Sequence, residues 1–113
     1  MMLTAEELQQ LTANAAFFCN LAALDMQERG RHIHLTEQLR TSIVESRELR
    51  SGFEFKLAAS ISLGELVEWV FNESKCCPFF DFTVNLQPHG SGLWLKLEGR
   101  DGVKPFIKAE LNF

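Results

Sequence analysis

The sequence contains no tyrosine and only three prolines, and it has no long apolar run. Ten phenylalanines supply most of the aromatic mass, and because Phe carries no polar group these rings are expected to pack in a dry core. No stretch approaches the roughly 20 apolar residues that a membrane-spanning helix needs. The N-terminus also lacks the basic start and apolar centre of a secretory signal. We therefore expect a cytoplasmic protein with no membrane partner.

An excess of positive charge is also missing. The chain has 11 Lys and Arg residues against 15 Asp and Glu residues, which gives a formal net charge of −4. An acidic surface gains nothing from the counterion release that drives binding to phosphate backbones. We therefore expect no nucleic-acid partner.

Cysteine is scarce, and its pattern is not that of a disulfide-stabilised secreted domain. There are three cysteines, which is an odd number, and Cys76 and Cys77 are adjacent. Such usage fits a reducing compartment better than an oxidising one.

What the sequence does contain predicts a single α+β domain spanning residues 1–113. The length is that of one domain, and an apolar fraction of 46% is enough to bury a core. Helix starts are indicated by capping-box pairs, in which two side chains satisfy free amides of the first turn. The pairs are Thr4 with Glu7, Asp25 with Glu28, and Ser62 with Glu65. Pro78 is expected to end the third helix, and a short last helix is expected around 103–107, with Asp101 as its cap.

Alternation of apolar and polar residues predicts four strands, at about 43–49, 53–57, 80–86 and 93–97. The expected element order is therefore ααββαββα, with the strands forming a four-stranded antiparallel sheet. Because only one face of such a sheet is apolar, all helices are expected on that face. Phe55, Phe82, Val84 and Leu95 should be buried beneath them, and Thr83, Asn85 and Lys96 should face the other side.

Two of these strands share a pattern. Residues 52–57 match residues 92–97 position by position, each as a glycine-led strand that follows another strand and precedes a helix. This suggests two strand-strand-helix halves, although six residues are few enough for the match to arise by chance.

The run from Cys76 to Phe80, Cys-Cys-Pro-Phe-Phe, is the least ordinary part of the chain. Together with Cys19-Asn20, Glu28-Arg29, Arg31-His32 and Gly102-Val103-Lys104, it resembles a group of small bacterial proteins that share this motif. The resemblance implies a shared fold and no established activity. Pro105 departs from the helix-favouring residue expected there.

Cys19, His32, Cys76 and Cys77 form a candidate site for a soft metal ion. Thiolates suit zinc, copper(I), mercury or arsenic(III), and a neutral imidazole can join them. Against this, adjacent residues on a helix point about 100° apart, so vicinal cysteines chelate one ion poorly. Buried cysteines are also ordinary core residues. Helical spacing places Cys77 with Leu63, Leu66 and Val70 toward the sheet, and Cys76 nearer the edge of that face.

Catalytic features are missing. The cysteine pair lies at a helix C-terminus, where the helix dipole disfavours a thiolate nucleophile. Glu65 is explained by capping, and Glu68 and Glu73 by a solvated helix face. We find no paired carboxylates, phosphate-binding glycine loop or nucleophile elbow. The chain is therefore expected to be a non-enzymatic domain, with no cofactor other than a soft metal ion.

Trp94 is the remaining candidate for function. Its place in the alternation puts it on the polar side of the sheet beside Lys96, and tryptophan is enriched where proteins meet partners. A partly shielded surface residue is the alternative. Two hypotheses therefore stand: a domain that acts by association, as a homodimer with Trp94 in its interface, and a thiol-dependent soft-metal-binding protein.

Overall fold

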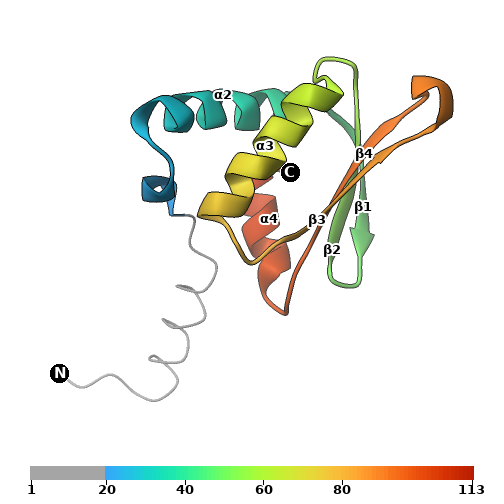
Figure 1. The fold of residues 1–113 in the computed structure, drawn as a ribbon. Coiled ribbons are helices and arrows are strands. Elements are labelled where there is room, and N and C mark those ends of the chain that lie inside the picture. Colours follow the sequence, from blue (N-terminus) through green and yellow to red (C-terminus); the bar gives the residue numbers. More distant parts are fainter. Residues whose placement is uncertain (1–19) are drawn as a thin grey trace.

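The computed structural model describes residues 20–113, so the first expected helix and Cys19 lie outside the described residues. Figure 1 shows the arrangement of the helices and strands. In chain order these are η1 (Leu21–Ala23), α2 (Met26–Ser42), β1 (Ile43–Leu49), β2 (Gly52–Leu57), α3 (Leu63–Cys76), β3 (Asp81–Leu86), η2 (Pro88–Gly90), β4 (Leu93–Glu98) and α4 (Val103–Leu111). The α+β class and the four strands are confirmed.

The two long helices begin at the capping boxes that the sequence indicated. The side chains of Asp25 and Ser62 accept hydrogen bonds from the backbone amides of Glu28 and Glu65, and both glutamates accept bonds from the cap amides in return. Each cap satisfies amides that the first helical turn leaves free. Helix α3 ends at Cys76, immediately before the Cys77-Pro78 pair, as expected.

The last helix differs from the prediction. Helix α4 extends to Leu111, and its N-cap is Gly102 rather than Asp101, with no side-chain capping bond. Gly102 has a φ of 94°, in the left-handed region that glycine adopts without steric cost. Pro105 is the third helical residue, within the first turn, where a missing N–H leaves no helical bond unmade.

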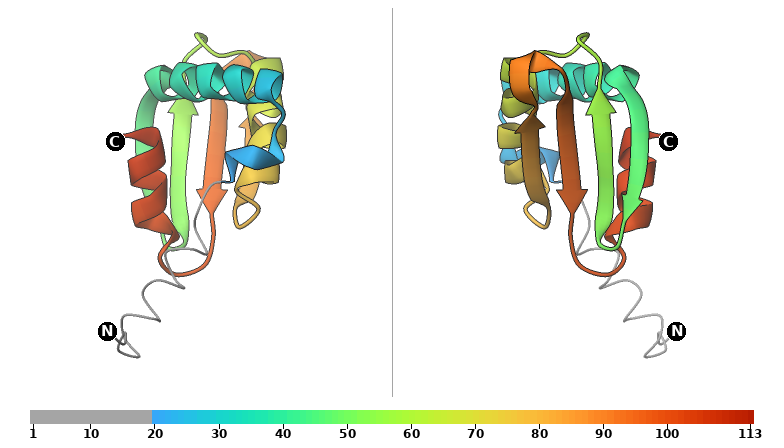
Figure 2. Two further views of the ribbon diagram at one scale, coloured as in Figure 1. Left: turned by 90° about the vertical axis from the view of Figure 1, so that its left-hand side faces the viewer. Right: turned by 90° about the vertical axis from the view of Figure 1, so that its right-hand side faces the viewer.

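The strands form one antiparallel sheet in the order β1-β2-β4-β3. At its centre Phe55 and Leu95 are opposite each other, and both are fully buried. On the edge strand β3, Phe82 and Val84 are half-buried while Thr83 is exposed, so the alternation has the expected register. Figure 2 shows α2, α3 and α4 in front of the strands in one view and the bare strands in front in the opposite view.

The core is a single apolar cluster between the sheet and the helices. The central strands contribute Phe53, Phe55, Leu95 and Leu97, and each helix contributes its inward residues, among them Leu39, Trp69 and Ile107. Among residues 20–113, no helix has both the length and the apolar character needed to cross a membrane.

Candidate metal centre

The buried face of α3 is rotated from the one that the sequence indicated, although Leu66 and Cys77 are buried as expected. Leu63 is 41% exposed, whereas Leu66, Trp69, Glu73 and Cys76 are buried. The expectations that Cys76 lies near the edge of the face and that Glu73 is solvated are therefore wrong. Helix α3 is apolar on two sides, since Val67 and Phe71 are exposed, so its own pattern could not identify the covered side.

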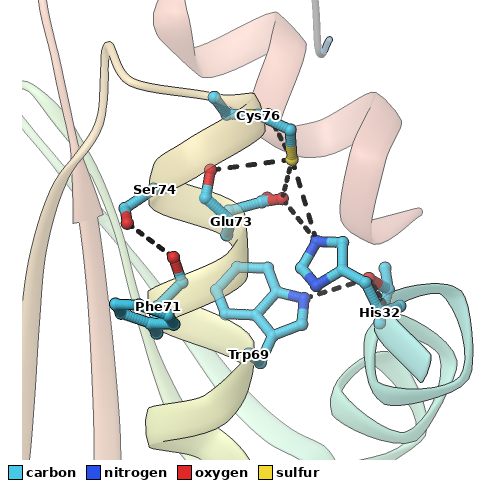
Figure 3. Close-up of polar contacts among 8 residues, drawn as sticks. His32, Trp69, Phe71, Glu73, Ser74 and Cys76 are labelled. Atoms are coloured by element: carbon cyan, nitrogen blue, oxygen red, sulfur yellow. Dashed lines mark hydrogen bonds and ion pairs between the residues drawn. The ribbon is translucent and has the colours of Figure 1, made fainter. Parts of the chain in front are cut away.

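Three side chains with metal-binding atoms meet at this buried face. His32 comes from α2, and Glu73 and Cys76 come from successive turns of α3; all three are buried. His32 Nε2 lies 2.9 Å from Glu73 Oε1, and the Cys76 Sγ lies 3.5 Å from the same oxygen and 4.0 Å from Nε2. Figure 3 shows the three side chains pointing toward one another between the two helices. Helical spacing predicts that His32 shares the inward face of α2 with Leu35 and Leu39, and this is confirmed. The same spacing turns His34 away from that face, and His34 is exposed.

Trp69 and Thr36 hold the imidazole of His32 in place. The indole of Trp69 stacks on the imidazole, with centroids 5.9 Å apart and planes inclined by 18°. Its Nε1 donates a hydrogen bond of 3.0 Å to Thr36 Oγ1, which in turn donates to the backbone carbonyl of His32. The ring is therefore fixed by contacts from both helices, which is the usual condition of a preorganised ligand.

A second carboxyl group, from Glu110 on α4, completes the polar cluster. The carboxyl oxygens of Glu73 and Glu110 and the sulfur of Cys77 lie within 4.8 Å of one another. Burial, followed by the hydrogen bond to Glu73 and that residue's charge, raises the pKa of Glu110 to about 10. Burial also raises the pKa of Glu73. Glu110 is therefore protonated at neutral pH.

The remaining groups of the cluster also favour their neutral forms. Burial lowers the pKa of His32, and burial together with the charge of Glu73 raises the pKa of the Cys76 thiol to about 12. Cys76 is a free cysteine, but as a protonated thiol it is a poor nucleophile.

The other two predicted ligands, Cys77 and Cys19, are not part of this group of three. Cys77 is buried and disulfide-bonded, contrary to the expectation of reduced cysteines, so it offers no free thiolate. Its sulfur lies 3.9 Å from that of Cys76. Cys19 lies outside the described residues. Sequence reasoning missed Glu73 and Glu110; the spacing of Glu73 three residues before Cys76, on one helix face, is the signal that could have identified the first.

Trp94 belongs to the opposite side of the sheet and takes no part in the cluster. Its side chain is only 8% exposed, and the guanidinium carbon of Arg47 lies 4.4 Å from its ring centroid. Polar residues of the neighbouring strands, Glu54, Thr83, Asn85 and Lys96, surround it. Arg47 therefore covers much of the ring within one chain.

No protein-family model, curated protein or solved structure matches the chain.

Proposed function

We propose that this protein binds a zinc-like divalent metal ion through His32, Glu73 and Cys76. The arrangement of the three ligand atoms supports this proposal. They form a triangle with sides of 2.9, 3.5 and 4.0 Å, so the point equidistant from all three lies about 2.1 Å from each. Bond lengths of zinc to imidazole, carboxylate and thiolate are about 2.0–2.3 Å. The three atoms are therefore close enough together for one ion to contact all of them.

The donor set favours zinc over the softer ions considered from the sequence. One thiolate, one imidazole and one carboxylate suit an ion of intermediate softness such as Zn²⁺, or Co²⁺ in its place. Copper(I), mercury and arsenic(III) prefer several thiolates, and Cys76 is the free cysteine among the described residues. We therefore narrow the soft-metal hypothesis to this one-thiolate site.

The burial of the Glu73 carboxylate also supports a bound cation. A fully buried carboxylate is costly without a compensating charge, and an ion on Glu73 Oε1 would supply that charge.

Metal titration of protein made without an affinity tag tests the proposal. We expect one Zn²⁺ per chain with a dissociation constant of about 1 µM or tighter, measured by calorimetry in a non-coordinating buffer. Cobalt(II) should give a thiolate charge-transfer band. Cys76→Ser should remove that band, and Cys76→Ser or Glu73→Gln should weaken zinc binding by at least about 100-fold.

The matched control is His34→Ala, because His34 lies on the same helix but is exposed. This variant should bind zinc as the wild type does. Circular dichroism of the metal-free variants separates loss of a ligand from loss of the fold. Wild-type protein that is folded but binds neither Zn²⁺ nor Co²⁺ would overturn the proposal.

Self-association through the uncovered sheet face, with Trp94 in the interface, stays a prediction. It is supported by the bare strand surface in Figure 2. If the protein dimerises, Trp94→Ala should raise the dimer dissociation constant in sedimentation equilibrium. An unchanged constant would contradict the interface.

A further inference from the structure

The candidate metal centre lies at the floor of a pocket. A cavity of about 590 Å³ opens between α2, α4 and η1, a volume in the usual range of small-molecule sites. His32, Glu73 and Glu110 line it, whereas Cys76 does not. The thiolate therefore lies behind the proposed ion, away from the cavity.

This placement leaves the front of the ion open. Three protein ligands and a fourth position free for a small molecule are the arrangement of an open zinc site, unlike the four-ligand structural sites. Glu110 lines the cavity and contacts Glu73, but its carboxylate is not part of the group formed by His32, Glu73 and Cys76. Beside its contact with Glu73, an oxygen of this carboxyl can accept a further hydrogen bond from a molecule in the cavity.

We propose that the pocket binds small molecules with an apolar, aryl-sized body and a neutral azole-type head. The head's unprotonated nitrogen occupies the fourth position of the ion, and its N–H donates a hydrogen bond to Glu110. This inference rests on the proposed metal function and names the class of ligand for the same site.

The charges of the ion and of its protein ligands favour a neutral head group on the bound molecule. A divalent ion with the Glu73 carboxylate and the Cys76 thiolate forms a neutral unit, so an anionic head would bring uncompensated negative charge into a buried site. Both the ionised and the protonated carboxyl of Glu110 have an oxygen that accepts an N–H. A neutral azole has one nitrogen for the ion and one N–H for this oxygen.

The apolar lining of the cavity favours a ligand with an apolar body. Leu21, Ile33, Phe106 and Ala109 line the cavity with apolar surface. At the mouth Arg40 donates a hydrogen bond of 2.8 Å to Glu37, so these two charges neutralise each other. The cavity thus offers apolar contact between the polar groups at its mouth and those at its floor.

The experiment uses the full chain loaded with cobalt(II) and titrated with 4-phenylimidazole. Replacement of a coordinated water by the azole should shift the cobalt d–d absorption bands, and the shift gives the dissociation constant. Phenylacetate is the matched anionic probe, and we expect it to bind at least about tenfold more weakly. The metal-free protein should bind the azole at least about tenfold more weakly as well.

Pocket variants separate this inference from the metal proposal. Ala109→Trp fills the cavity from an exposed position of α4, so it should keep cobalt binding but weaken azole binding at least about tenfold. Ala59→Trp, at an exposed position away from the pocket, should leave both unchanged. Cobalt binding without azole binding, or azole binding unaffected by Ala109→Trp, would overturn the inference and leave the metal site standing. Failure to bind cobalt would overturn both.

Discussion

Glu110 is a carboxylic acid that the fold holds in its protonated form. It faces Glu73 and Cys76 of α3 and His32 of α2, and burial with the neighbouring Glu73 charge raises its pKa to about 10. A carboxyl group with a higher pKa in the folded chain than in the unfolded one favours folding at low pH. Its contribution to the free energy of unfolding is complete below the ordinary pKa of 4.5 and is lost as the pH rises toward about 10.

The variant Glu110→Gln tests this consequence in metal-free protein kept in chelator. The amide has the shape of the protonated acid but does not ionise. We therefore expect the variant to be more stable than the wild type above about pH 5, by a margin that grows toward alkaline pH. Urea denaturation across this pH range measures it. Glu37→Gln is the control: that residue lies at the pocket mouth, its side chain 58% exposed, and should leave the wild-type pH profile unchanged. Parallel profiles for Glu110→Gln and the wild type would contradict the assignment.

At the level of single residues, the sequence predicted only those positions that local spacing determines. His32, Leu35 and Leu39 share one face of α2, and all three are buried as expected. Glu73 could not be predicted, because its burial depends on His32, 41 residues earlier, and on Glu110 of α4. An acidic residue on a helix is normally solvated, and only a partner from a distant segment reverses that.

Helices and strands were predicted more completely than side-chain partners, because capping and alternation are local signals. The boundaries of α2, α3 and the four strands agree with the capping pairs, Pro78 and the alternating residues. The prediction of the covered side of α3 was wrong at Leu63, because the side that is covered depends on distant segments and not on a local signal. Leu63 and Val67 are apolar yet exposed, so the choice of side was made by the packing of neighbouring elements.

Two glycines in different elements should respond in opposite ways to the same substitution. A Cβ at Gly52 of β2 would overlap the backbone carbonyl oxygen of Leu97 on the adjacent strand. Gly30 of α2 is exposed and has no atom within 4 Å of the position of its Cβ. We expect Gly52→Ala to destabilise the protein by about 2–3 kcal/mol, because the central strands must separate.

Gly30→Ala should instead stabilise the protein by about 0.5–1 kcal/mol, since alanine restricts the unfolded chain and favours the helix. Thermal and urea denaturation of both variants measure the differences. Equal effects of the two substitutions would show that the strand contact at Leu97 does not limit the backbone.

The sheet and the helices that follow its two hairpins repeat one arrangement, which η1 and α2 precede. The order β1-β2-β4-β3, with the central pair antiparallel, relates the hairpin β1–β2 to the hairpin β3–β4 by a local twofold axis between β2 and β4. Each hairpin is followed by a helix, α3 or α4. The matching segments 52–57 and 92–97 are these central neighbours. Glu73 lies on α3, after the first hairpin, and Glu110 lies on α4, after the second, so the polar cluster joins the two repeats; His32 is added from α2.

The long sequence separation of the ligand residues has a kinetic consequence. His32 is 41 residues from Glu73 and 44 from Cys76, so the three atoms come together only after α2 has docked on α3. A metal ion held by them would bind the native state but not a transition state in which this docking is incomplete. Saturating zinc should therefore lengthen the lifetime of the native chain while leaving its rate of refolding unchanged. Stopped-flow unfolding and refolding with and without zinc would show this as a shift in the unfolding arm alone.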